Sequence, residues 1–366
     1  MSALLDLKRK DRIMWYLPKP NTTDLNNYVA YMSKKIKESP HYARFQNVLE
    51  VNRHGRDIDF VDLLLRAEPE RQRKLNRALM KRIFGKAYQE KHLRQLTEIN
   101  KKASRGKQLG AYEQRIYNTY HDDVDELRKL FNYGSWISGD KDYSYSISRI
   151  KHTNVCPYCN RQYTLTIEHT DEEGNVVEHI AKPHFDHWYP KEAFPLLALS
   201  FYNLVPSCSV CNSSIKGNIV MGASRFVHPY NQPDGYEPGF HFRVLFRGDM
   251  DFELYETRPT DRREENMLKA FYLQDAYKYH EHLEVEDLVK LQRAYSGRYL
   301  SKLMKNILND LLPKMNVREI IRIVFGAEID AAHMNDRPLS KLKKDLLVQF
   351  RVIDNNGNLH PDLQGT

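Results

Sequence analysis

The chain has 366 residues, of which 41% are hydrophobic and 28% are charged. This composition is typical of a folded globular protein with a sizeable core, and the length allows two or three domains. No apolar run is long enough to cross a membrane, and the amino terminus lacks the pattern of a secretory signal. We therefore expect a cytoplasmic protein that has no membrane partner.

The positive charge is concentrated in the amino-terminal part of the chain. The formal net charge is +8, yet residues 1–150 hold 30 basic and 19 acidic residues, and residues 151–220 hold 5 basic and 7 acidic ones. Residues 71–110 alone contain 13 basic and 2 acidic residues. Such a block predicts contact with a polyanion such as nucleic acid, although a solvated helix face would give the same pattern.

Residues 1–150 are expected to be mostly helical. Apolar residues recur at helical spacing between Arg71 and Lys107, while Gly85 and the segment 101–110 interrupt or end the helices. The functional interpretation is a basic helical surface that contacts a nucleic-acid backbone, and the alternative is an amphipathic scaffold. The candidate contacts are Arg71, Arg73, Lys74, Arg77, Lys81, Arg82, Lys101, Lys102, Arg105 and Lys107.

The four cysteines form two pairs, Cys156 with Cys159 and Cys208 with Cys211, each with two residues in between. Disulfides are not expected without an export signal, and thioredoxin-like redox chemistry needs only one such pair. Four thiolates make one tetrahedral set of soft ligands, which favours a structural Zn²⁺ ion with no open position for chemistry. Because 48 residues separate the pairs, the segment that they enclose must have structure of its own.

The enclosed segment contains an expected β-hairpin and a cluster of polar residues. The stretch 162–182 alternates as a hairpin does, with an acidic turn at 173–175. Further along stands the string DHWYPK, which begins at Asp186 and His187, and then NLVPSC, which begins at Asn203. Any one of these residues taken alone is more simply explained as structural.

The order of these motifs resembles the HNH endonucleases with a ββα-metal fold, in a form held together by zinc. The matching parts are CPYC at 156–159, Asp186-His187 with Pro190-Lys191, NLVPSC at 203–208, and CSVCN at 208–212 followed by Lys216. The four-cysteine frame is also similar to HNH subunits of bacterial anti-phage systems of the Septu and retron-associated types. The resemblance covers residues 151–220 and leaves the flanking regions without an interpretation.

The resemblance implies a role for each of these residues. His187 would act as the general base, since a neutral imidazole can accept a proton from water. Asp186 and Asn212 would supply oxygen ligands for a catalytic Mg²⁺ or Mn²⁺, with Asn212 standing where the family usually has a histidine. Asn203 would hold the loop beside the base, and Lys216 would contact a phosphate. His184 shares a strand face with Asp186 and is a possible additional contact.

The carboxy-terminal region is expected to begin with a second hairpin. Alternating apolar residues at 240–246 and 252–254 predict its two strands. Helices follow, with a long apolar stripe from Leu288 to Leu311 and a last helix at 338–350 that has Pro338 in its first turn.

Together these patterns predict an α+β fold in three regions. Residues 1–150 are basic and mostly helical, residues 151–225 form the zinc-stabilised module, and residues 226–366 form a hairpin followed by helices. The expected function is metal-dependent hydrolysis of nucleic acid, with DNA favoured over RNA, in anti-phage defence. An ATPase or another defence-system subunit is the candidate protein partner. The alternative is a non-catalytic subunit that binds nucleic acid or docks a partner.

Overall fold

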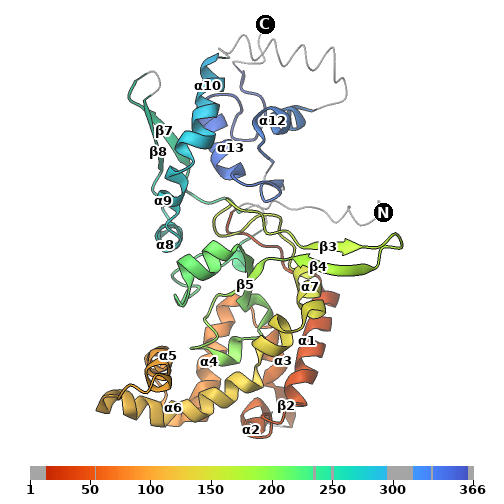
Figure 1. Cartoon of the computed structure of the whole chain (residues 1–366), viewed down its shortest axis with the longest axis vertical. Coiled ribbons are helices and arrows are strands. Elements are labelled where there is room, and N and C mark those ends of the chain that lie inside the picture. Colours follow the sequence, from red (N-terminus) through yellow and green to blue (C-terminus); the bar gives the residue numbers. More distant parts are fainter. Residues whose placement is uncertain are drawn as a thin grey trace.

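The computed structural model describes residues 14–53, 55–233, 236–248, 251–294, 316–330 and 333–361. In these ranges the fold is α+β, as predicted: helices predominate, and the strands form antiparallel pairs. The molecule is elongated, with the amino-terminal helices at one end, the central segment in the middle and the carboxy-terminal elements at the other end (Figure 1). None of the helices in the described ranges has the length and apolar character needed to span a membrane.

The amino-terminal region is helical, with one short hairpin that the sequence did not indicate. Helix α4 begins with Pro69, which lacks the N–H group that would be unpaired there, and ends at Gly85, whose φ is 56°. The elements are α1 (Thr22–Lys37), α2 (Gln46–Leu49), β1 (Glu50–Arg53), β2 (Arg56–Asp59), α3 (Phe60–Leu65), α4 (Pro69–Phe84), α5 (Glu90–Ser104), α6 (Ala111–Leu130) and α7 (Lys141–Ile150).

The central region contains two strand pairs and a short helix. The predicted hairpin is confirmed as β3 (Ile167–Thr170) and β4 (Val176–Ala181), which pair antiparallel. The second pair joins β5 (His184–His187) to β6 (Leu204–Ser207), and the π-helical turn η5 (Val210–Lys216) follows at once. The chain between β5 and β6 forms the 3₁₀ turns η3 (Pro195–Leu197) and η4 (Phe201–Asn203).

The carboxy-terminal region begins with the expected hairpin. The last helix starts at Ser340, so Pro338 precedes the helix and does not lie in its first turn as predicted; Leu339 between them has a φ of 61°. Only the first part of the predicted apolar stripe lies in the described residues, on α10. The elements are β7 (Phe242–Phe246), β8 (Phe252–Glu256), α8 (Arg262–Ala270), α9 (Leu273–Lys278), α10 (Glu286–Ala294), α12 (Val317–Phe325) and α13 (Ser340–Gln349).

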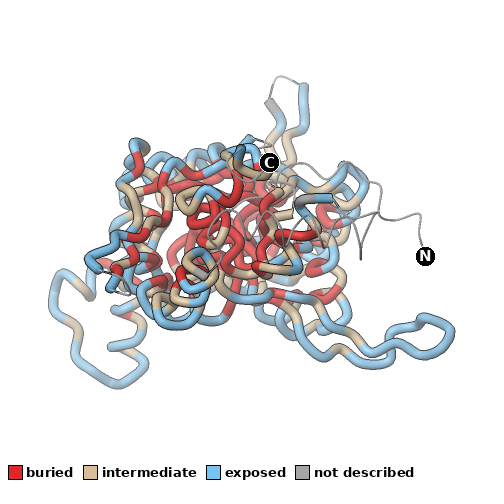
Figure 2. The backbone as a smooth tube through the Cα atoms, turned by 90° about the horizontal axis from the view of Figure 1, so that it is seen from above, coloured by how far each residue is buried: buried red, intermediate tan, exposed pale blue. Residues whose placement is uncertain are grey.

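A continuous buried cluster runs through all three sequence regions. Buried backbone fills the middle of the molecule, and the exposed segments lie around it (Figure 2). Long-range hydrogen bonds connect the regions: Trp15 Nε1 donates to the Tyr158 carbonyl at 3.0 Å, and the Tyr28 hydroxyl donates to the Leu199 carbonyl at 2.7 Å. The amino-terminal region, through Trp15 and through Tyr28 of α1, therefore contacts the central segment directly.

A buried ion pair fastens α13 to the second hairpin. Lys341 Nζ lies 2.7 Å from Asp345 Oδ2 and also donates to the Phe240 carbonyl at 3.0 Å. The same carboxylate accepts a hydrogen bond from the Phe242 backbone N–H at 2.9 Å. Both side chains are buried, at 0% and 5% exposure, so neither charge can be solvated by water if its partner is lost.

Asp345→Ala should therefore lower the free energy of unfolding by about 3–5 kcal/mol, because it leaves the Lys341 ammonium buried and uncompensated. Urea denaturation followed by circular dichroism measures the loss. The double variant Lys341→Met, Asp345→Leu should be more stable than the single variant, since it removes both charges. A single variant as stable as the wild type would contradict this account of the pair.

Candidate active site and metal centre

The two cysteine pairs meet in the folded chain. The sulfur atoms of Cys156, Cys159, Cys208 and Cys211 are buried and all lie within 4.8 Å of one another. The Sγ atoms of Cys159 and Cys208, which are 49 positions apart in the sequence, are 4.0 Å apart. The Cys211 backbone N–H points at Cys208 Sγ, 3.4 Å away. The arrangement can hold a metal ion such as zinc.

The dimensions of the cluster suit zinc. With Zn–S bonds of about 2.3 Å, the sulfurs of a tetrahedral site lie about 3.8 Å apart. Burial and the neighbouring sulfurs raise the pKa of the Cys156 thiol, because a second thiolate beside the first has no water to screen it. A bound cation removes that cost, and the four buried sulfurs therefore fit a metal-binding role.

Strands β5 and β6 and the turn η5 bring the enclosed polar residues together. In the antiparallel register Asp186 lies opposite Val205 and His187 opposite Leu204. The turn η5 begins three residues after β6 ends, and it contacts β5. The order along the chain is therefore strand, strand and helix, with Asp186 and His187 on the first strand and Asn212 on the helix.

Asn203 braces the loop that follows His187. Its side chain is fully buried and makes three hydrogen bonds to the backbone. The amide oxygen accepts from Tyr189 N at 2.8 Å, and Nδ2 donates to the carbonyls of Tyr189 and Leu197 at 3.1 and 2.9 Å. The Asn203 carbonyl also accepts from Trp188 N at 2.9 Å, which fixes the first residue after β5. The Asn203 side chain thus connects Tyr189 to Leu197, two residues of the loop that follows His187.

His187 is half-buried, and its tautomer follows from its contacts. Nε2 lies 3.0 Å from the Ala198 carbonyl, which can only accept, so the proton resides on Nε2 and Nδ1 is left as an acceptor. Burial, with smaller contributions from Lys191 and Lys216, lowers the pKa of His187 to about 3. The Tyr133 ring packs edge-on against the imidazole with a centroid distance of 4.4 Å. The imidazole is therefore held neutral and in one orientation.

Asp186 and Lys216 form a buried ion pair, and this placement of Lys216 differs from the expected one. Lys216 Nζ lies 2.9 Å from Asp186 Oδ1 and donates to the His187 carbonyl at 2.7 Å. The other carboxylate oxygen, Oδ2, accepts from the Tyr158 hydroxyl at 2.7 Å. The side-chain exposures of Lys216 and Asp186 are 1% and 3%, so the ammonium group is not available to a phosphate in solvent.

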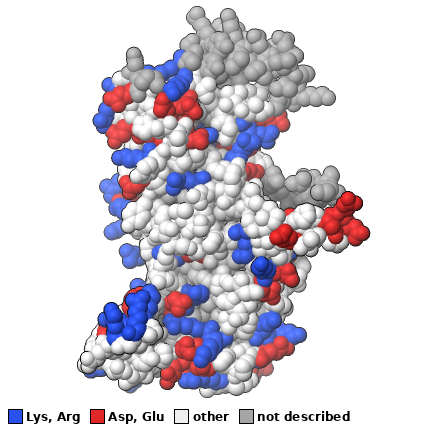
Figure 3. Space-filling model, viewed as in Figure 1, with Lys and Arg blue, Asp and Glu red and all other residues white. Residues whose placement is uncertain are grey.

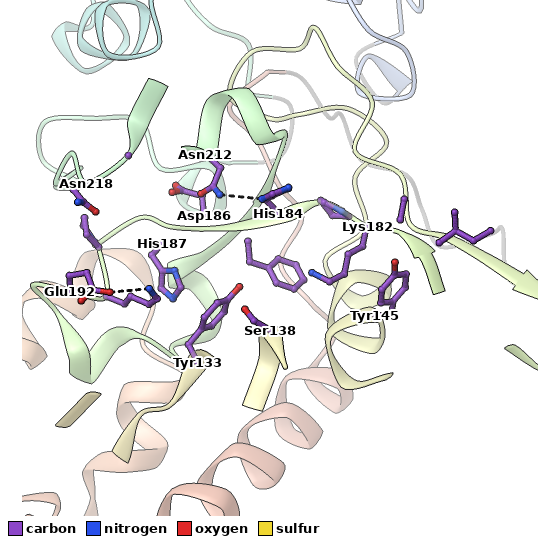
Figure 4. A pocket seen from close by; sticks show the side chains of 17 residues that line it. Tyr133, Ser138, Tyr145, Lys182, His184, Asp186, His187, Glu192, Asn212 and Asn218 are labelled. Atoms are coloured by element: carbon purple, nitrogen blue, oxygen red, sulfur yellow. Dashed lines mark hydrogen bonds and ion pairs between the residues drawn. The ribbon is translucent and has the colours of Figure 1, made fainter. Parts of the chain in front are cut away.

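His184 and Asn212 lie beside Asp186. His184 Nδ1 is 3.5 Å from Asn212 Nδ2, and the two side chains meet next to Asp186 at one wall of a cavity (Figure 4). His184 is exposed and Asn212 is half-exposed. An imidazole, an amide and a carboxylate thus converge from β5 and η5.

A cavity of about 660 Å³ opens over these groups. It brings together His184, Asp186, His187 and Asn212, but neither Asn203 nor Lys216 lines it. Several other residues that line the cavity were not predicted from the sequence. Tyr133 is one of them, because it lies before α7, far in sequence from the motifs of the candidate site, and belongs to no recognisable motif. Lys182 carries no ion pair in the described chain and packs over the Phe185 ring at 4.7 Å. Other lining residues are Tyr133, Ser138, Tyr145, Lys182, Lys191, Glu192 and Asn218.

The basic block lies on α4, α5 and the segment that follows α5. Lys and Arg side chains gather over the projection made by α5 and α6, at the lower left of Figure 3. Some of the candidate contacts are already paired: Arg73 with Glu90, Lys101 with Glu98 and Lys102 with Glu113. Arg82 lies over the Phe60 ring. No side-chain hydrogen bond or ion pair occurs in the described chain for Arg71, Lys74, Arg77, Lys81, Arg105 or Lys107.

Comparison of the chain with protein-family models, curated proteins and solved structures found no match. The resemblance to HNH nucleases therefore remains a prediction from the motifs.

Purified protein should contain one zinc ion per chain, measured by elemental analysis. Cys208→Ser should lose the ion and lower the melting temperature, because it removes one of four sulfur ligands. Ser209→Ala, at the adjacent exposed position, is the matched control and should keep the zinc. A metal-free wild type with an unchanged melting temperature in a chelator would contradict the prediction.

Lys216→Met should destabilise the fold by about 3–5 kcal/mol, since it leaves the Asp186 carboxylate buried without its counter-ion. A lysine on the surface would give a change within about 0.5 kcal/mol. Urea denaturation distinguishes the two values, with Lys182→Met as the control at the rim of the same cavity. A loss equal to that of the control would show that Lys216 is not buried against Asp186.

Proposed function

We propose that the protein is a metal-dependent endonuclease of the HNH type, which hydrolyses phosphodiester bonds in nucleic acid, with DNA the favoured substrate. The observation that carries the proposal is the convergence of Asp186, His187 and Asn212 in one cavity, on two paired strands and the helical turn that follows them. The order of the motifs predicted that these three residues act together. Their proximity supports the proposal, because a base and metal ligands must lie close together to act on one phosphodiester.

His187 is the proposed general base. Its Nε2 proton is donated to the Ala198 carbonyl, so Nδ1 can accept the proton of a water molecule that attacks the phosphorus atom. The reaction consumes one water and leaves one phosphate monoester and one hydroxyl group. Tyr133 and the loop braced by Asn203 limit rotation of the imidazole, which keeps the base in place for the attack.

Asp186 and Asn212 are the proposed protein ligands of a Mg²⁺ or Mn²⁺ ion, with His184 as a possible third contact. Each Asp186 oxygen accepts one hydrogen bond from the protein and keeps a lone pair for a further partner. Such an ion, when bound, would polarise the phosphodiester and stabilise the charge that develops on it. Lys216 neutralises the carboxylate, so the surplus negative charge that attracts the ion must come from the substrate phosphate.

Lys182 and Lys191 take the place of Lys216 as proposed phosphate contacts. Both line the cavity, whereas Lys216 is buried beneath it. Lys191 Nζ also lies 3.1 Å from Glu192 Oε1, and this pair is partly exposed, so it can exchange its partner for a phosphate at little cost.

The cysteine cluster is proposed to bind a structural Zn²⁺ ion that also positions the active site. Tyr158 lies between the first two cysteines and donates to Asp186, and Asn212 directly follows the last cysteine. The first cysteine pair therefore encloses a residue that contacts one candidate metal ligand, Asp186, and the second pair is followed directly by the other, Asn212. A role in anti-phage defence, with an ATPase or another subunit as partner, rests on the resemblance of the motifs alone.

A second function, binding of nucleic acid without cleavage, is favoured by one observation. Both oxygens of Asp186 already have protein donors, which reduces the capacity of this carboxylate for a metal ion. A cleavage assay separates the two functions.

The wild type should cut plasmid DNA, single-stranded DNA or total RNA in the presence of Mg²⁺ or Mn²⁺. His187→Ala should reduce the rate by about 10²–10⁴-fold, because general-base catalysis contributes by that order. Gel electrophoresis measures cleavage, and elemental analysis checks that the variant keeps its zinc.

His169→Ala is the matched control for this substitution. His169 also follows an acidic residue, Glu168, but it lies exposed on β3 and does not line the cavity. The control should cut at the wild-type rate. Equal rates for His187→Ala and the wild type would refute the assignment of the base, and a wild type that binds nucleic acid without cutting it under either metal would favour the second function.

A further inference from the structure

A second cavity, of about 590 Å³, is also lined by a residue of the segment that follows β5. Tyr189 lines this cavity, whereas its neighbour Pro190 lines the candidate active site. The walls come from α4, the loop at 222–224 and the start of α8. Its volume falls within the range of about 300–1,000 Å³ that is usual for ligand pockets. We name it the α4 cavity.

Cationic side chains dominate the lining of the α4 cavity. Arg73, Lys74 and Arg77 stand at helical spacing, so they share one face of α4, and Arg263 faces them from α8. Lys74 and Arg77 are exposed, and neither makes a side-chain hydrogen bond or ion pair in the described chain. Their charges are therefore available to a ligand.

The two other arginines are held in place by acidic residues outside the cavity. Arg73 donates from Nε and Nη2 to the two Glu90 oxygens, at 3.0 and 2.8 Å. Arg263 donates from Nε and Nη2 to Asp261 Oδ2, at 3.0 and 2.7 Å. In both guanidinium groups Nη1 has no partner among the described residues. Such fixed, partly free guanidinium groups match the oxygens of a phosphate and lose little conformational entropy on binding.

The loop at 222–224 lines the cavity together with Tyr189, which lies two residues after His187 of the candidate active site. Ala223 and Tyr189 both line the cavity, and the Tyr189 backbone N–H donates to Asn203 Oδ1 at 2.8 Å. A side chain at Gly222 would approach Arg73 Nη1 at 3.4 Å, so glycine leaves that nitrogen room. Glu70 is the one carboxylate in the lining, and its Oε1 accepts a hydrogen bond from Asn231 Nδ2 at 3.1 Å.

We propose that the α4 cavity binds a phosphate group, through Lys74, Arg77 and the free edges of Arg73 and Arg263. The phosphate belongs either to the backbone of a nucleic-acid strand or to a free nucleotide. In the first case the inference extends the proposed function, because the cavity would hold a strand beside the candidate active site. Binding of a phosphate in the α4 cavity requires neither cleavage nor the Mg²⁺ or Mn²⁺ ion of the candidate active site.

The test is fluorescence anisotropy of the full chain with a labelled DNA oligonucleotide, without added divalent cations, over a range of salt concentrations. Lys74→Ala, Arg77→Ala should weaken binding on the order of tenfold and reduce the slope of log K against log salt by roughly one to two, as the loss of one or two phosphate contacts does. Lys34→Ala, Lys35→Ala removes the same charge from the exposed face of α1 and is the matched control, expected to bind like the wild type.

Competition with ATP and with inorganic phosphate distinguishes the two sources of the phosphate. If the ligand is a nucleic-acid strand, the Lys74→Ala, Arg77→Ala variant binds DNA more weakly than the wild type, and millimolar ATP does not displace DNA from the wild type. A free nucleotide gives ATP binding to the wild type that the variant loses. Equal affinities of the wild type and both variants for DNA and for ATP would overturn the proposal. Because His187 is intact in every protein and cleavage is not measured, failure of the proposed hydrolysis leaves this result unaffected.

Discussion

The four buried sulfur atoms impose the constraint on which the central region depends. Forty-eight residues lie between Cys159 and Cys208, and bringing their ends together costs chain entropy that the few hydrogen bonds of β5 and β6 do not offset alone. A metal ion held by the cluster would supply that free energy, as it does in small zinc modules. The closure also brings Tyr158, which donates to Asp186, and Asn212, which lies beside Asp186, to the same place. The cysteine cluster therefore stabilises the fold of the central region and also positions residues of the candidate site.

The buried pair of Asp186 and Lys216 has two physical consequences. It permits a carboxylate to lie almost fully buried beside the cavity, because the ammonium group lies 2.9 Å away. It also removes the net charge that would make the carboxylate a strong cation site by itself. In the proposed nuclease this arrangement would make binding of the catalytic ion depend on the substrate phosphate, so the ion would bind together with the nucleic acid.

The segment between β5 and β6 joins two polar cavities with different electrostatics. Its residues Pro190 and Lys191 line the candidate active site, and its residue Tyr189 lines the cationic α4 cavity. Asn203 fixes this segment from within through its bonds to Tyr189 and Leu197. A strand held on α4 would thus be positioned relative to the base by the same buried amide that orients the loop.

The sequence by itself determined the α+β class, the helical amino-terminal region, both predicted hairpins and the grouping of the cysteines, since periodicity and ligand spacing are local properties of the chain. The tertiary structure decided which charges are free. The motifs implied that Lys216 contacts a phosphate, but in the fold Lys216 is buried against Asp186. The role of Tyr158 depends on a contact with a residue 28 positions away. The α4 cavity needs a loop and a helix far from α4 in sequence. Burial and pairing arise only when distant segments pack, so local patterns cannot fix them.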